Sequence, residues 1–333
     1  MKILVSAQAL VCFAFAMLVV GCGSEQPGMT QAPTSQSQIR HAPTAMGTPL
    51  PQPPTRRKRP GSIKRGVSGG YLYLADEYNS QIDVFPLAGN KQAQIGMITD
   101  GVSTPYALWN DAHKYLYVAN QGNNTVTRYG YGGTTPLKTW SQDLSRPLYP
   151  IVDSYGNLFV GNANNGTIVE YKSGSTSAYQ VIQTPGVEVD GLAFDQQGNL
   201  YAAYRTAPEG SGSIEEFAPG STQGQILGMD LDQPQGLIVD TSGNIVVAIT
   251  GGPNSLLVFP PGSQTPSTTL PLPDKNTPTQ VMIDKIQAFL YDSSFTNDTG
   301  YGIRYPFTAH FEFVKDQATA LIQGVMTTNN LLP

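Results

Sequence analysis

The sequence predicts an all-β fold made of repeated units of four short strands, and its composition and a recurring turn support this. The 333 residues include 35 glycines and 26 prolines, and charged residues make up only 13%. Such a composition favours many turns and short strands over long helices with surface ion pairs. The recurring turn begins with an aspartate and leads into an apolar run, as in residues 195–201 (DQQGNLY).

The aspartates that begin these turns recur at a nearly constant spacing. They are Asp111, Asp153, Asp195, Asp240 and Asp284, which are 42, 42, 45 and 44 residues apart. An apolar run precedes each of them, and a second apolar run, a third alternating run and a weaker fourth run follow. A period in the low forties with four strands per unit is typical of the blades of a β-propeller.

The repeated motif Asp-x-x-Gly-Asn is typical of a tight turn between two strands. It occurs at residues 153–157, 195–199 and 240–244. We expect the carboxylate to accept hydrogen bonds from backbone N–H groups two and three residues on, and the glycine to adopt a positive φ. A catalytic role would require these aspartates to line the channel, where five equivalent copies would be redundant. The motif therefore predicts a structural aspartate.

Counting the units predicts six blades and a ring closed by the C-terminal tail. The first unit begins with residues 72–75 and has no innermost strand before it. Residues 324–332 resemble 101–109, which precede the second unit, so the tail could add the missing strand and remove two exposed sheet edges. In the last unit we expect the third strand at 310–313 and the fourth at 319–322.

Residues 1–22 are typical of an export signal with a lipidation site. Lys2 precedes an apolar run over residues 3–20, and residues 18–22 (LVVGC) resemble the bacterial lipobox. This predicts cleavage before Cys22 and diacylation of its thiol, which would tether the chain to a membrane. The alternative is a membrane-spanning anchor, because the run is nearly long enough to cross a bilayer. No aspartate follows Cys22, which favours the outer membrane or cell surface.

Residues 23–68 are predicted to form a disordered tether because they are rich in Ser, Thr, Gln, Pro and Gly and lack periodic apolar residues. Their basic cluster at residues 56–59 (RRKR) could contact anionic lipid or simply be a solvated linker. From residue 66 onward the chain has 11 basic and 23 acidic residues, a net charge of −12. This charge argues against a nucleic-acid partner. We also expect the protein to be a monomer.

Residues 69–333 resemble the propellers of the NHL and YncE-like families. The resemblance rests on Pro-x-Gly-Leu at residues 234–237 and Gly-Asn-Leu-Tyr at 198–201. Two further stretches, 217–221 (FAPGS) and 259–263 (FPPGS), resemble repeats of secreted bacterial propellers. The resemblance implies a propeller fold with six or seven blades and does not imply one function, since this architecture has many roles.

Candidate ligands lie in the loops expected around one mouth of the central channel. These candidates are Glu188, Asp190, Asn120, Asn162, Arg205 and Asp292. Oxygen donors of this kind suit a hard cation such as Ca²⁺. Asp190 breaks the repeat, because the other units have Tyr, Leu, Gln or Thr at its position. With Glu188 it could bind a metal or act as a base, or it could be a water-solvated residue of the channel wall.

Two longer loops, 204–213 and 292–309, depart from the compact repeat. Aromatic residues make the second loop either a binding surface or a flap over the last blade. They include Phe295, Tyr301, Tyr305 and Phe307.

Two functions follow from these observations. The first is a lipid-anchored scaffold of the cell envelope that binds a protein, glycan or small molecule. The second is a metal-dependent hydrolase or lactonase with a site in the channel. The three histidines are widely separated at positions 41, 113 and 310, which argues against a zinc site built from histidines. No nucleophile elbow, phosphate loop or dinucleotide fingerprint is present.

Overall fold

The computed structural model describes Ile63 and residues 70–86, 93–207, 210–252, 254–272, 278–283, 289–294, 299–304, 310–315 and 322–327. Side chains are described up to Met282. The chain divides into two compact units, residues 1–56 and 57–333. The first unit, with the expected signal and Cys22, lies outside the described residues. Within the described part, no helix is long and apolar enough to cross a membrane.

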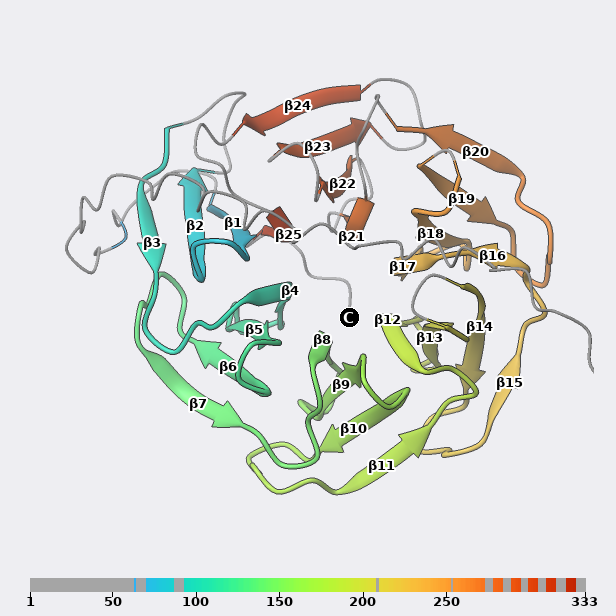
Figure 1. The fold of residues 1–333 in the computed structure, drawn as a ribbon, viewed down its shortest axis with the longest axis horizontal. Helices are drawn as coiled ribbons and strands as arrows, with labels where there is room; N and C mark the ends of the chain where they lie inside the picture. Colours follow the sequence, from blue (N-terminus) through green and yellow to red (C-terminus); the bar gives the residue numbers. More distant parts are fainter. Residues whose placement is uncertain are drawn as a thin grey trace, which may run out of the picture. The chain divides into compact units, whose positions relative to one another are not determined.

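Five antiparallel sheets consist of strands that follow one another in the chain (Figure 1). One contains β4 (Pro105–Asn110), β5 (Leu116–Asn120), β6 (Thr125–Tyr129) and β7 (Pro136–Trp140). The next contains β8 (Pro147–Val152), β9 (Leu158–Asn162), β10 (Thr167–Tyr171) and β11 (Gln180–Gln183). The third contains β12 (Glu188–Phe194), β13 (Leu200–Arg205), β14 (Ser211–Phe217) and β15 (Gly224–Ile226), with β16 (Leu231–Asp232) paired to β14.

The last two of these sheets complete the series. One contains β17 (Pro234–Val239), β18 (Ile245–Ile249), β19 (Ser255–Phe259) and β20 (Thr268–Pro271). The other contains β21 (Pro278–Ile283), β22 (Phe289–Ser294), β23 (Thr299–Arg304) and β24 (His310–Lys315). The predicted all-β propeller with antiparallel, four-stranded blades is thus confirmed.

A further sheet combines strands from the two ends of the domain. Its order is β25 (Ile322–Thr327), β1 (Tyr71–Asp76), β2 (Gln81–Pro86) and β3 (Gly96–Ile98). The tail therefore pairs with the first unit, with Val325 opposite Leu74. The structure has five blades of consecutive strands instead of the six that the repeat count predicted, because no innermost strand precedes β1 among the described residues.

The last blade differs from its sequence prediction. The stretch at 310–313, expected as a third strand, belongs to the fourth strand β24, and the expected loop 292–309 contains the third strand β23. Residues 299–304 (TGYGIR) contain two glycines and little apolar alternation, so the usual strand signal is weak there. Phe295, Tyr305 and Phe307 lie outside the described residues, and the expected fourth strand at 319–322 is described only at Ile322, where β25 begins.

The innermost strands contact one another around the centre of the domain (Figure 1). β4 contacts β8, β8 contacts β12, β12 contacts β17, β17 contacts β21, and β25 contacts both β21 and β4. Every residue of β8 and β17 is buried, whereas every residue of β15 is exposed. Inner strands with two covered faces explain the continuous apolar runs of the sequence.

Apolar side chains fill the spaces between neighbouring blades. Ile168 and Ile182 of one blade pack in the same cluster as Leu192, Leu200 and Phe217 of the next. Each blade therefore buries its apolar surface against the following blade. This arrangement explains why one repeat alone cannot form a core.

Ile63, from the range predicted as tether, is buried against the outer strand of the first sheet. It is 4% exposed and belongs to the cluster around Leu74 and Ile82. A Cβ atom at Gly96 of β3 would lie 3.0 Å from its Cα and Cγ1 atoms. The glycine thus permits this close approach.

The repeated aspartates form the expected turns, with one change in geometry. Oδ1 of Asp195 accepts hydrogen bonds from the backbone N–H groups of Gln197 (2.9 Å) and Asn199 (2.8 Å), which are two and four residues on rather than two and three. The Asn199 amide donates to Oδ2 of the same aspartate at 2.8 Å. The same contacts occur at Asp153 and Asp240. Asp284 lies outside the described residues.

Candidate functional site

A bulge in the β12–β13 hairpin leaves Asp190 without a backbone partner in the innermost strand of its blade. Glu188 pairs with Arg205 and Val189 with Tyr204, and the register then shifts before Gly191, so Asp190 has no partner opposite it. At Gly191 a Cβ atom would lie 2.6 Å from the carbonyl oxygen of Gln235 in the next blade. The glycine allows β12 and β17 to approach closely, and the Asp190 side chain is fully buried.

Arg205 neutralises two buried carboxylates. Its Nε donates to Asp190 Oδ2 at 2.8 Å and its Nη2 donates to Oδ1 at 2.7 Å, which is a bidentate pair. The same Nη2 forms a salt bridge with Oε2 of Glu188. Burial lowers the pKa of Arg205, but the hydrogen bonds and charges of Asp190 and Glu188 outweigh this effect and raise it. Arg205 therefore stays charged.

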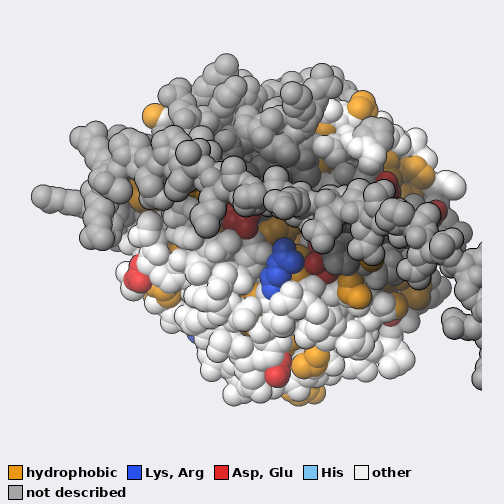
Figure 2. Space-filling view, in the orientation of Figure 1, with side chains coloured by type: hydrophobic (Ala, Val, Ile, Leu, Met, Phe, Trp, Pro, Cys, Tyr) orange, Lys and Arg blue, Asp and Glu red, His pale blue; other side chains and the backbone are white. Residues whose placement is uncertain are grey.

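A chain of polar contacts continues from Glu188 to the loops of three further sheets. Arg146 Nη1 lies 3.4 Å from Glu188 Oε1, and Arg146 Nε donates to Gln121 Oε1 at 3.1 Å. The Gln121 amide in turn donates to Glu77 Oε1 at 2.8 Å. Figure 2 shows basic side chains near the middle of one face, with acidic side chains on either side of them. The charges at this mouth are thus paired with one another.

Deeper polar groups also find partners across the channel. The Tyr106 hydroxyl donates to Gln235 Oε1 at 3.1 Å, and Gln280 Nε2 donates to the Leu108 carbonyl at 2.6 Å. Burial raises the pKa of Tyr106, and the nearby charge of Asp190 raises it further. These residues join blades that are distant in the sequence, which is a structural role.

Asn120 and Asn162 occupy equivalent positions in successive blades, and both bind their own loops. Oδ1 of Asn120 accepts from the Ser103 N–H at 3.0 Å, and Oδ1 of Asn162 accepts from the Ser145 N–H at 3.0 Å. Both asparagines are fully buried. Their amides are therefore used to hold the loop that leads into each innermost strand.

Of the six candidates, the structure brings three together, namely Glu188, Asp190 and Arg205. Asn120 and Asn162 bind their own loops instead, and Asp292 lies in β22, where only the backbone is described. Arg146 and Gln121 were not predicted as members of this cluster, because they lie in loops of different repeats and belong to no shared sequence motif. The pairing of Glu188 with Arg205 could not be counted from the sequence, because the turn pairs Phe194 with Leu200 and the register shift at Asp190 moves the partner of Glu188 by one residue.

The cluster has little capacity for metal binding or base catalysis. A Ca²⁺ ion bound by Glu188 and Asp190 would have to displace the Arg205 guanidinium from both carboxylates. Within the described part of the chain, no group of three or more His, Cys, Asp or Glu side chains has the geometry to hold a metal. Asp190 is also not a solvated wall residue, because none of it is exposed. The structure thus shows Asp190 in an ion pair with Arg205.

Comparison with known proteins supports the fold. No family model matches the chain, and no curated protein matches it. A solved chain from the crystal structure of a nidogen/laminin complex is similar, with a TM-score of 0.67, 19% identity, and coverage of 79% of this chain and 100% of that one. Hydrazine synthase of Kuenenia stuttgartiensis is similar with a TM-score of 0.58, 15% identity, and coverage of 78% and 79%. At these identities the likeness shows a β-propeller fold alone.

We expect Arg205→Ala to lower the free energy of unfolding by about 3–5 kcal/mol, because it leaves the buried charge of Asp190 unpaired. Urea unfolding followed by circular dichroism measures this. Arg146→Ala is the control: its side chain is 46% exposed, so the loss should stay below about 1 kcal/mol. The double variant Asp190→Ala, Arg205→Ala should lose less stability than the sum of the two single variants. Additive losses would contradict the direct coupling.

Proposed function

We propose that this protein is an exported, lipid-anchored β-propeller of the cell envelope that acts as a binding or interaction scaffold. The anchor is the acylated Cys22, and the tether that connects it to the domain ends before Ile63, which packs against the first sheet. The β-propeller fold, which the Pro-x-Gly-Leu and Gly-Asn-Leu-Tyr motifs also imply, is consistent with a binding role. The absence of an aspartate directly after Cys22 favours the outer membrane or the cell surface.

The observation that carries this proposal is the pairing of charges at the channel mouth. Asp190 and Glu188 both form ion pairs with Arg205, and a metal ion bound by these two carboxylates would have to displace the guanidinium. The loops and grooves between blades then provide the surface available to a partner. A propeller of similar fold comes from a nidogen/laminin complex, which shows that such a fold is compatible with a protein assembly.

Calcium binding distinguishes the scaffold from the metal-dependent hydrolase or lactonase. Isothermal titration of the chelator-treated full chain with CaCl₂ is expected to give the same heat of binding for the wild type and for Glu188→Gln. The reason is that the Glu188 carboxylate already forms an ion pair with Arg205. One-to-one binding that Glu188→Gln removes would favour the enzyme and overturn the scaffold.

Cys22→Ser is expected to abolish both the lipid modification of the N-terminal peptide and the cleavage before residue 22, because it removes the thiol that the lipid would modify. Expression in a bacterium with lipoprotein processing, followed by fractionation and mass spectrometry of the N-terminal peptide, measures this. Cys12→Ser lies within the apolar run of the signal and should leave the anchoring unchanged. A wild-type N-terminus that is uncleaved and carries no lipid would support the spanning anchor instead.

We infer that the sheet of β25, β1, β2 and β3 serves as a sixth blade and closes the ring. The pairing of β25 with β1, and its contacts with β21 and β4, support this inference. Without β25, the edge of β1 would be unpaired and the apolar faces beside it uncovered.

Deletion of residues 325–333 is expected to destabilise the whole domain strongly, since it removes half of β25. Thermal unfolding followed by circular dichroism would show a transition at a much lower temperature or no cooperative transition. Deletion of residues 329–333 alone keeps all of β25 and is the control. A wild-type transition in the longer deletion would contradict ring closure.

A further inference from the structure

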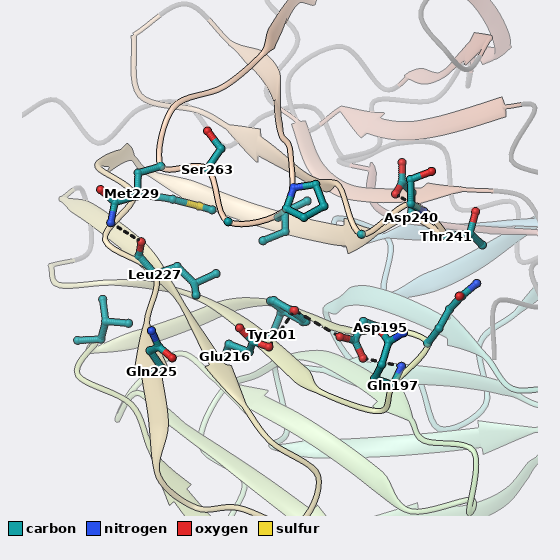
Figure 3. Close-up of a pocket in the computed structure, with 18 residues that line it drawn as sticks. Asp195, Gln197, Tyr201, Glu216, Gln225, Leu227, Met229, Asp240, Thr241 and Ser263 are labelled. Carbon is teal, nitrogen blue, oxygen red and sulfur yellow. Dashed lines mark hydrogen bonds between the residues drawn. The ribbon is translucent and has the colours of Figure 1, made fainter.

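A pocket lies between two neighbouring blades, at the opposite end of the strands from the Arg205 cluster. Its volume is about 520 Å³, which is within the usual range for small-molecule sites. In Figure 3, Tyr201, Glu216 and Gln225 from the β12–β15 blade face Asp240, Thr241 and Ser263 from the β17–β20 blade. The Asp195 and Asp240 turns form one end of this pocket.

The charged residues that line this pocket are all acidic. They are Asp195, Glu216 and Asp240, and no Lys, Arg or His is among the lining residues. The two aspartates accept hydrogen bonds from their own turns, so their oxygens are already engaged. Glu216 differs: among the described residues only the Tyr201 hydroxyl donates to it, at 3.1 Å to Oε1. Its second oxygen remains available to a ligand.

The preceding groove shows how the same position is satisfied within the chain. Glu170 pairs with Phe159 in its blade as Glu216 pairs with Tyr201 in the next, so the two glutamates are equivalent. Glu170 forms a salt bridge with the Lys172 ammonium and accepts from Gln180 Nε2 at 2.6 Å. The residue equivalent to Lys172 in the next blade is Ala218. The ammonium that neutralises Glu170 therefore has no counterpart at Glu216.

An apolar wall stands beside this carboxylate. Ile226, Leu227 and Met229 line the same pocket, and Ile226 is 51% exposed although it is a large apolar side chain. An aliphatic stem would cover such a surface while its charged end reached the polar side, as the side chains of lysines do at protein surfaces. The pocket thus combines an acidic end with an apolar wall.

We propose that this pocket binds a primary ammonium group carried on an aliphatic stem. Glu216 accepts hydrogen bonds from the ammonium, while Ile226 and Leu227 cover the stem. The same chemistry is offered by a free alkyl diamine and by a lysine side chain of a protein partner. This assignment rests on the proposed binding function and names the class of ligand that the scaffold takes.

Titration of the full chain with 1,5-diaminopentane and, separately, with a peptide that contains one lysine tests this site. Isothermal calorimetry should detect binding of at least one probe, and Glu216→Gln should weaken it about tenfold or more through loss of a charge-assisted hydrogen bond. Glu170→Gln is the matched control at the equivalent position and should leave the affinity unchanged. Tighter binding of the peptide identifies a protein partner, and tighter binding of the diamine identifies a free amine.

Ala218→Lys is a second variant that does not remove any side chain of the pocket. It places an ammonium where Lys172 stands in the preceding blade, so it should compete with the ligand and weaken binding about as much as Glu216→Gln. Circular dichroism of each variant establishes that it is folded. Absence of binding by both probes up to about 10 mM, or equal binding by wild type and Glu216→Gln, would overturn this assignment. The calcium titration tests the scaffold independently, so the two failures can be told apart.

Discussion

Arg205 holds two buried carboxylates, Asp190 and Glu188, where the innermost strands meet. A buried charge is costly unless a partner and hydrogen bonds compensate for its lost hydration. The guanidinium meets this requirement with a bidentate contact to Asp190 and a second contact to Glu188, and Arg146 adds a partner from the preceding blade. The Arg205 cluster consequently joins the innermost strands of neighbouring blades.

The grooves between blades are where the repeats differ chemically. One position of the third strand is Arg128, Glu170 and Glu216 in three successive blades, each opposite an aromatic residue of the second strand. The Arg128 guanidinium carbon lies 4.5 Å from the centre of the Tyr115 ring, and Glu170 has Lys172. At Glu216 the cation is missing from the residues that line the pocket, whereas the pocket beside Glu170 contains Lys172. A constant framework with variable grooves is how one fold can recognise different ligands.

The parts of the fold that depend on local chemistry could be predicted. The spacing of Asp111, Asp153, Asp195 and Asp240 marks the hairpins, because each carboxylate satisfies the backbone of its own turn. Prediction failed at the last blade, where β23 is rich in glycine and lacks apolar alternation. The residue types also did not reveal the partners at the site: Asn120 and Asn162 could be ligands by type, and their side chains bind the neighbouring loops.

The sequence by itself determined the repeat, the strand types and the position where the repeat is broken. These features depend on turn geometry and on the apolar pattern of a strand, and both are set by residues that are close in the chain. The sequence also singled out Asp190, but not the partners that change its role. Only the tertiary structure decided that Arg146, Gln121 and Glu77 join the Arg205 cluster, and that Glu216 faces a pocket. Those contacts link blades about 40 residues apart in the chain, the repeat length of such folds, and their partners are chosen by the packing of one blade against the next.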